Sequence, residues 1–264
     1  MKGFFRNLAL QKDLLLSITG LCLVLFIVAH LAMDATIIIG PDAFNGIATI
    51  LERFYLAQIG VPLVILALVT HIVVALLKQK NKFLSVSKAF VRATHPETLI
   101  WIIQLTTGLL LIGLALLHVV VIVLDNVTKI NIVSTSVRIA DVKFQIFYHV
   151  LMNVTMVHIS CGIYRLYAKW VGSGRRKFIP FVLLFFLIYW SVSTVALQKY
   201  MDYAPHFKKL KSLLIDYEKD RENDVLRHKI IKISLEQNIS ITPELLKKIG
   251  IDKDILPDFS NTGH

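Results

Sequence analysis

Five long apolar segments constrain the fold of this chain more than any other feature of its sequence. Each is long enough, at about 1.5 Å of rise per helical residue, to cross a hydrocarbon core of roughly 30 Å as one α-helix. They cover residues 14–39, 56–77, 99–124, 144–170 and 178–197. Hydrophobic residues make up 55% of the 264 positions, more than is usual in soluble domains. We therefore expect an all-α integral membrane bundle of five transmembrane helices.

Two regions follow from these segments. Residues 1–199 are expected to form one transmembrane domain, and residues 200–264 an extramembrane tail of unassigned role. The tail is mixed in charge and predicts one or two amphipathic helices. A further short helix is predicted in "TPELLKKIG", with Thr242 as N-cap, Pro243 at its first position and Gly250 at its end. A solvated appendage and a docking arm for a partner both fit this pattern.

The net charge of +11 is unevenly distributed along the chain. Thirteen Lys and Arg side chains lie before the first segment, between the second and third, and at the end of the fourth with the loop after it; four lie on the opposite side. The positive-inside rule then predicts a cytoplasmic N-terminus and, after five crossings, a C-terminal tail outside the membrane. Because the charges gather at membrane borders, they do not indicate a nucleic-acid partner. The first segment is too long for a signal-peptide core, so we expect it in the mature chain.

Four of the nine histidines lie deep in four different predicted helices. They are His30, His71, His118 and His158. Any one of them alone would fit a hydrogen-bonded histidine inside a bundle, but four ionisable side chains within the membrane favour a functional set. The predicted topology places His30 and His118 nearer the outside and the other two nearer the cytoplasm, at levels about 10 to 15 Å apart. His149 has no counterpart at its depth and receives no role.

Two histidines at one depth, without a neighbouring carboxylate or thiolate, favour axial ligation of a flat macrocycle over a zinc site. We therefore predict two b-type haems. His30 and His118 would hold the outer haem, and His71 and His158 the inner haem.

A Thr-Gly dipeptide recurs ten residues before each outer histidine, at Thr19-Gly20 and Thr107-Gly108. The two glycines lie about 15 Å inward of those histidines, at the level of the inner haem, where a missing side chain would leave room for the ring. Close packing of helices is the alternative explanation. Hydrogen-bonding partners for haem propionates are expected near the membrane surfaces, although these residues also suit interfacial anchoring. The candidates are Ser17, Trp101, Arg138 and Lys169.

The sequence resembles a known family, the dihaem cytochrome b subunit of quinol:fumarate reductase and succinate:quinone reductase. The resemblance is to the single-chain five-helix type found in epsilonproteobacteria. The resemblance covers about residues 14–172. It rests on "SITGLCLVLFIVAHL", "HIVVALLK", "HPETLIWIIQLTTGLLLIGLALLHVVV", "STSVRIAD" and "VHISCGIYRLYAKW". The fifth helix follows in register. The resemblance also implies a bacterial cytoplasmic (inner) membrane, with the C-terminus in the periplasm.

The resemblance implies an electron path from a menaquinol site near the outer surface, through two haems b, to an iron–sulfur subunit on the cytoplasmic face. A partner FAD-containing subunit would interconvert fumarate and succinate, so the dicarboxylate site lies outside this chain. The family's haem ligands fall on the four histidines, and its quinol-site glutamate falls on Glu52. A homodimer of such heterotrimers is compatible with this interpretation.

Two positions depart from the family pattern. Met156 stands where the best-described relative has a glutamate implicated in proton transfer across the membrane. Asp34 is not a family feature, and we hypothesise that it adds a second outer carboxylate near Glu52.

Two other functions remain compatible with the residues. The first is the cytochrome b subunit of another respiratory complex, such as a hydrogenase, formate dehydrogenase or nitrate reductase, which would differ in its catalytic partner. The second is a transporter that uses intramembrane histidines for protons or a metal. A transporter would favour carboxylate neighbours or broken helices at mid-membrane, and the sequence shows neither.

Overall fold

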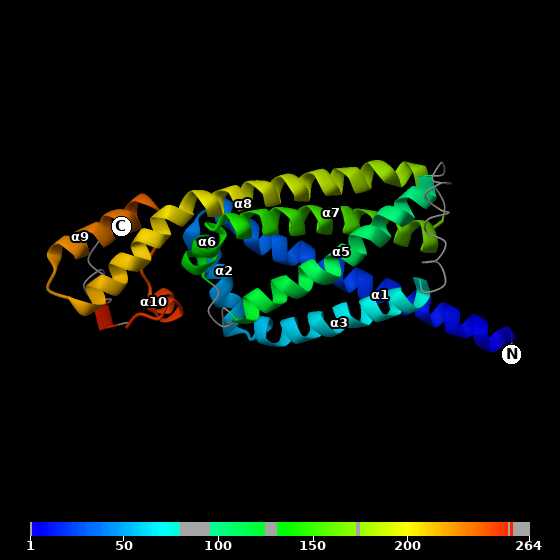
Figure 1. Ribbon diagram of the computed structural model, residues 1–264, viewed down its shortest axis with the longest axis horizontal. Helices are drawn as coiled ribbons and strands as arrows, with labels where there is room; N and C mark the ends of the chain where they lie inside the picture. The colour runs from blue at the N-terminus through cyan, green and yellow to red at the C-terminus, as the bar shows by residue number, and fades with distance from the viewer. Residues whose placement is uncertain (1, 80–95, 125–130, 173–174, 253, 256–264) are drawn as a thin grey trace. The chain divides into compact units, whose positions relative to one another are not determined.

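The computed structural model describes residues 2–79, 96–124, 131–172, 175–252 and 254–255 (Figure 1). Within these ranges the chain forms helices and no strand. Five helices are long and apolar enough to cross a membrane, over Leu8–Ile38, Leu56–Gln79, Pro96–Ile122, Val142–Trp170 and Lys177–Lys219. The predicted all-α class and the five membrane-length helices are therefore confirmed, and the chain is a multi-pass membrane protein.

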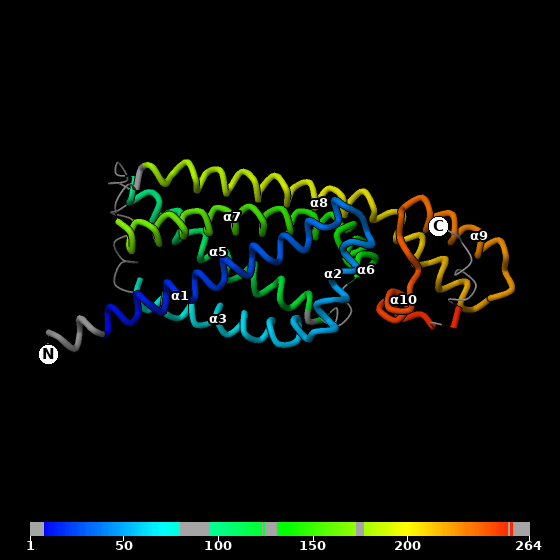
Figure 2. Tube along the Cα trace, turned by 180° about the vertical axis from the view of Figure 1, so that it is seen from behind, coloured from blue at the N-terminus to red at the C-terminus, as the bar shows by residue number. Residues whose placement is uncertain are grey.

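The described residues pack as two compact units. The first contains Met1–Leu31, Ile59–Val120 and Val150–Ser191. It is built from most of the five long helices, which run alongside one another (Figures 1 and 2). These are α1 (Lys2–Ala35), α3 (Leu56–Gln79), α5 (Pro96–Leu124), α7 (Val142–Trp170) and the first part of α8 (Arg175–Lys219).

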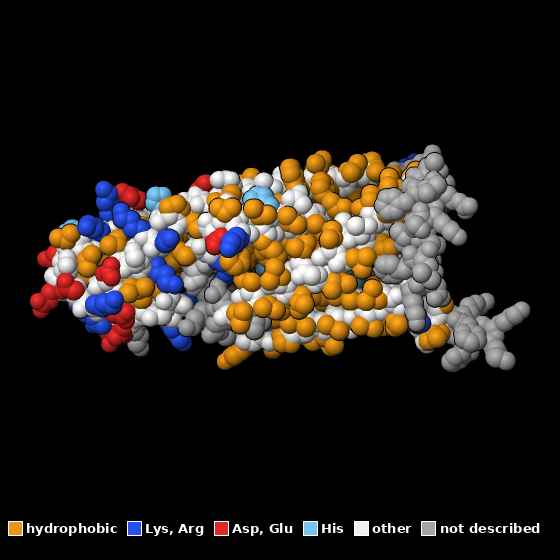
Figure 3. Space-filling view, in the orientation of Figure 1, with side chains coloured by type: hydrophobic (Ala, Val, Ile, Leu, Met, Phe, Trp, Pro, Cys, Tyr) orange, Lys and Arg blue, Asp and Glu red, His pale blue; other side chains and the backbone are white. Residues whose placement is uncertain are grey.

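The outer surface of the first unit is apolar. Leu25 is 61% exposed and Leu66 is 63% exposed, and similar side chains cover the long helices (Figure 3). In water such a surface would be strongly unfavourable, whereas in a bilayer the lipid tails cover it. The polar groups that matter for function therefore lie between these helices or at their ends.

The second unit contains Ala32–Gln58, Val121–His149 and Val192–His264. Its shorter helices are α2 (Pro41–Arg53), α6 (Ile132–Ile139), α9 (Asp224–Glu236) and α10 (Pro243–Ile249), with a short 3-10 helix at Thr36–Ile38.

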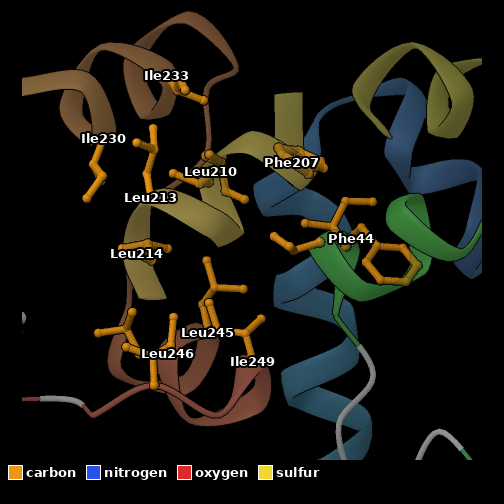
Figure 4. Close-up of a cluster of buried hydrophobic side chains, with 14 of the residues drawn as sticks. Phe44, Phe207, Leu210, Leu213, Leu214, Ile230, Ile233, Leu245, Leu246 and Ile249 are labelled. Carbon is orange, nitrogen blue, oxygen red and sulfur yellow. The ribbon is translucent and has the colours of Figure 1, made fainter. Parts of the chain in front are cut away.

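The second unit has a hydrophobic core like that of a soluble domain. Phe44 of α2, Leu210 and Leu214 of α8, Ile230 of α9 and Leu246 of α10 are all at most 1% exposed (Figure 4). Charged side chains gather on its surface instead (Figure 3). The C-terminal tail is therefore packed against α2 by a shared core.

The predicted short helix of the tail is confirmed as α10. Thr242 is its N-cap and accepts a hydrogen bond from the backbone N–H of Leu245 at 3.2 Å. Pro243 occupies the first position, and Gly250 ends the helix at a φ of 81°, a left-handed conformation that favours glycine. The cap and the stop together define the two ends of α10.

Helix α8 continues without a break through positions 199 and 200, where the sequence predicts the end of the membrane domain. The apolar run ends there, but the helix does not, because buried side chains such as Phe207 and Leu214 pack into the core of the second unit.

Several cations behind the topology prediction lie outside the described residues. These are Lys80, Lys82, Lys88, Arg92 and Lys129. The orientation of the chain in the membrane therefore stays a prediction.

Candidate functional site

The two histidines of the predicted outer pair lie together in the first unit. His30 of α1 and His118 of α5 have ring centroids 6.3 Å apart, with the ring planes at 63°. Phe26, one turn before His30, stacks on the His30 imidazole at 5.6 Å. Because a bond from imidazole nitrogen to a metal is roughly 2 Å long, two rings at this separation have space for one metal atom between their nitrogens.

The predicted inner pair consists of His71 on α3 and His158 on α7. Each imidazole lies on one of the two Thr-Gly dipeptides. Thr19 Oγ1 is 3.1 Å from His71 Nδ1, and Thr107 Oγ1 is 3.2 Å from His158 Nδ1. The repeated dipeptide therefore has one structural role on both α1 and α5, which is to receive an inner imidazole from a different helix.

Hydrogen bonding fixes which ring nitrogen of His71 carries the proton. The hydroxyl of Thr19 donates its single hydrogen to the carbonyl of Leu15 at 2.8 Å. Toward His71 it can only accept, so His71 Nδ1–H donates to it. In this tautomer the lone pair of Nε2 is available to a metal.

The same arrangement is found at His158. Thr107 donates to the carbonyl of Ile103 at 2.7 Å and so accepts from His158 Nδ1–H. The carbonyl of Gln104, which can only accept, lies 3.1 Å from the same nitrogen. The lone pair of the His158 imidazole is therefore also on Nε2, the nitrogen that makes neither of these hydrogen bonds.

The glycines of the two dipeptides are needed for these contacts. A Cβ at Gly20 would lie 3.1 Å from His71 Cε1, and a Cβ at Gly108 would lie 3.0 Å from His158 Cε1. Both distances are shorter than ordinary van der Waals contact. The glycines were predicted to make room for a haem at this level, and the structure places them against the imidazoles at that level.

The predicted propionate partners differ in their surroundings. Trp101 Nε1 is buried and has no hydrogen-bond partner among the described residues, so it is a donor that a carboxylate would satisfy. Ser17 instead accepts a hydrogen bond from Trp170 Nε1 at 2.9 Å. Lys169 pairs with Asp13 at 2.7 Å. Arg138 is half-buried on α6 in the second unit.

Asp13 is a contact residue that the sequence did not single out. Its carboxylate pairs with Lys169 of α7 and with Lys78 of α3. A single anion on α1 thus joins two cations from two other helices at one end of the first unit. Among the described residues this is the ion-pair network that holds the helix ends together.

Glu52, the predicted quinol-site carboxylate, lies in the last turn of α2 in the second unit. Its Oε2 is 3.2 Å from Nζ of Lys248 on α10, whose side chain is only 9% exposed. Its Oε1 is buried and has no hydrogen-bond partner among the described residues. Sequence reasoning missed Lys248, because nothing in the tail's sequence indicates that α10 packs beside α2.

Met156 and Asp34, the two positions that depart from the family pattern, both lie within the described residues. Met156 is 1% exposed in the first unit, so the position of the family's glutamate is occupied by a buried apolar side chain. The backbone carbonyl of Asp34 accepts a hydrogen bond from the Tyr200 hydroxyl at 3.3 Å. The idea that Asp34 acts as a second carboxylate beside Glu52 stays a prediction.

The described residues fit a macrocycle better than a bare ion. They contain no group of three or more His, Cys, Asp or Glu side chains that could hold a metal ion. They contain instead two pairs of histidines, and a macrocycle that already supplies equatorial ligands needs only two axial ones.

No protein-family model matches the chain. The fumarate reductase cytochrome b subunits of Helicobacter pylori strains J99 and 26695 are each 32% identical over 197 residues, covering 67% of this chain and 76% of theirs. The fumarate reductase cytochrome b subunit of Wolinella succinogenes is 28% identical over 165 residues, covering 58% of this chain and 64% of its own.

Proposed function

Because the chain belongs to the family of fumarate reductase cytochrome b subunits, we propose that it transfers electrons between menaquinol and the iron–sulfur subunit of a fumarate reductase or succinate dehydrogenase complex. The observations that support this proposal come from four membrane-length helices. His30 lies beside His118, and His71 and His158 lie in matching contacts on Thr19 and Thr107. Haem b held by such pairs supplies reversible one-electron chemistry.

The residues of the first unit have distinct roles in holding these groups. His30 and His118 would hold the outer haem, and His71 and His158 the inner haem. Thr19 and Thr107 are hydrogen-bonded to Nδ1 of the inner imidazoles, which leaves Nε2 of each ring to bind the haem iron.

Two further groups complete these sites. Gly20 and Gly108 leave the space that the inner imidazoles occupy. Trp101 Nε1 is the donor best suited to a propionate, since it is buried without a partner in the described part of the chain.

Glu52 is the residue that handles protons in this proposal. Oxidation of a quinol releases two protons with its two electrons, and a carboxylate oxygen within hydrogen-bond reach of the quinol hydroxyl accepts a proton as it leaves. Oε1 is the free acceptor, because Oε2 is occupied by Lys248. The protons then leave to the periplasmic side, toward which the predicted topology directs α2.

The proposed orientation places the partners on the opposite side. With a cytoplasmic N-terminus, the iron–sulfur and FAD-containing subunits dock on the cytoplasmic face, where the inner pair is nearer. The basic residues predicted there would orient the docking more than strengthen it. Fumarate and succinate interconvert on the FAD-containing subunit, so this chain contributes the quinone-reactive half of the enzyme.

Haem content tests the proposal directly. A dithionite-reduced minus oxidised spectrum of the purified chain, with haem quantified per polypeptide, is expected to give a b-type signal and two haems per chain. His118→Ala should lose the outer haem, and His158→Ala should lose the inner haem. The haem that remains in one variant should have a different reduction potential from the haem that remains in the other.

His149→Ala is the matched control. His149 lies on α7, the helix that carries His158, and its Nδ1 contacts the carbonyl of Gln145 in the same helix at 2.8 Å. This variant should keep both haems. A wild-type chain without a b-type spectrum would refute the proposal, and one haem per chain would refute the two-pair arrangement.

A further inference from the structure

The C-terminal segment contacts α2 at both ends of that helix. In the first turn of α2, the carboxylate of Asp42 accepts hydrogen bonds from the backbone N–H of Ser240 at 2.9 Å and from its hydroxyl at 2.5 Å. In the last turn, Glu52 pairs with Lys248. The two contacts lie on either side of Thr242, which starts α10. The segment that contains α10 is therefore tied to α2 by two polar contacts, one from Ser240 before the helix and one from Lys248 within it.

The position of Lys248 is fixed by packing as well as by charge. Leu245, Leu246 and Ile249 bury one side of α10 in the core of the second unit, at 3%, 0% and 9% exposure. A Lys side chain that is itself 9% exposed needs an anionic partner, because an unpaired buried charge is costly. Glu52 of α2 is that partner. Because α10 is anchored in the core by its buried side chains, the backbone position of Lys248 is also restricted.

The two oxygens of the Glu52 carboxylate consequently differ in their hydrogen-bond partners. Oε2 receives the Lys248 ammonium, while Oε1 is buried without a donor in the described part of the chain. A buried carboxylate oxygen without a donor is unfavourable unless a bound molecule supplies one. The hydroxyl of a quinol is such a donor.

We propose that Lys248 is a positioning residue of the quinol site, holding Glu52 by Oε2 so that Oε1 is presented to the quinol hydroxyl. This inference rests on the proposed role of Glu52. It assigns the C-terminal tail a function, since α10 supplies a group that the site needs. Lys248 itself does not touch the substrate in this proposal.

The test uses the complete complex and a water-soluble naphthoquinol as electron donor with fumarate as acceptor. Lys248→Met should lower kcat for quinol oxidation about tenfold, because a misplaced proton acceptor loses part of its catalytic effect. The KM for fumarate and the fumarate reduction rate with a reduced viologen dye, which bypasses this chain, should be unchanged. Lys248→Arg, which keeps the cation, should restore most of the quinol rate.

Lys247→Met is the matched control, since Lys247 is the neighbouring cation on α10 and is exposed. It should leave the quinol rate unchanged. Rates are normalised to haem content, so that loss of folded protein does not imitate the effect. A Lys248→Met complex with wild-type haem content and quinol kcat would overturn the proposal, as would an equal loss in Lys247→Met.

A double-mutant comparison separates this inference from the proposed function. Glu52→Gln should abolish most quinol oxidation, and Lys248→Met should have no further effect in that background, because Lys248 acts through Glu52. If Glu52→Gln retains full quinol activity, the assignment of Glu52 itself is wrong. If Glu52→Gln is inactive but Lys248→Met is fully active, only the positioning role fails.

Discussion

The imidazole of His158 lies directly on Gly108, so that a single added carbon at the glycine would approach the ring to 3.0 Å. His71 and Gly20 are related in the same way at 3.1 Å. The same Thr-Gly arrangement thus occurs on two helices. The glycine leaves room for the imidazole of a histidine, and the threonine before it is hydrogen-bonded to the Nδ1 of that ring. The hydrogen bond and the close contact together restrict the position of each inner imidazole.

Gly108→Ala should displace His158 and weaken binding of the inner haem. Overpacking of a close contact costs about 1–3 kcal/mol, enough to lower the haem content from two per chain toward one. Haem quantification of the purified protein measures this. Gly113→Ala, on the same helix, is the control, because a Cβ there has no neighbour within 4 Å. Equal haem contents in the two variants would contradict the steric role of Gly108.

Thr19→Val removes a hydrogen-bond acceptor from His71 while nearly keeping side-chain volume. The imidazole should become a weaker donor to the metal, because the hydrogen bond to Nδ1–H raises its basicity. We expect a more positive potential for the inner haem and a loss of haem affinity of about tenfold. A spectroscopic redox titration measures both. Thr106→Val, at an exposed site on α5, should titrate like the wild type; an unshifted Thr19→Val curve would exclude the hydrogen bond.

Asp13→Asn removes the anion shared by Lys78 and Lys169. Since all three side chains are partly exposed, at 25% for Asp13 and 35% for each lysine, solvent screening limits the loss of stability to about 1 kcal/mol. The thermal midpoint of the purified protein should fall by a few degrees at low salt. The difference from wild type should shrink at high salt, and a salt-independent difference would argue against an electrostatic cause.

Thr242→Ala removes the N-cap of α10. Loss of a threonine cap costs roughly 1 kcal/mol and should loosen the helix that carries Lys248. Limited proteolysis should cut the tail faster, and quinol oxidation should fall part of the way toward the Lys248→Met rate. Thr242→Ser keeps the acceptor and should behave as wild type. Faster proteolysis with an unchanged quinol rate would separate α10 from the site.

The sequence was sufficient for those features that depend on local pattern. Apolar run length predicted the membrane helices, and helical rise placed His30 with His118, which the structure brings to 6.3 Å. The caps of α10 followed from Thr242 and Gly250, because capping depends on residues within one turn.

Other features required tertiary packing. The recurrence of Thr19-Gly20 and Thr107-Gly108 was visible in the sequence, but which imidazole each pair receives depends on how helices are arranged. The Glu52 contact was invisible for the same reason, since Lys248 reaches it only after α10 has packed into a core shared with α2. The end of α8 was also hidden, because hydropathy reports where apolar residues stop and not where the helix stops.

The pairing of Glu52 with Lys248 has a consequence for biogenesis. Glu52 leaves the ribosome early, whereas Lys248 is translated after all five membrane-length helices. The carboxylate therefore has no Lys248 to pair with until α10 has been translated. All four histidines proposed to hold haem precede Lys248 in the sequence, so in the proposed function the haem ligands are translated before Glu52 can gain its cation.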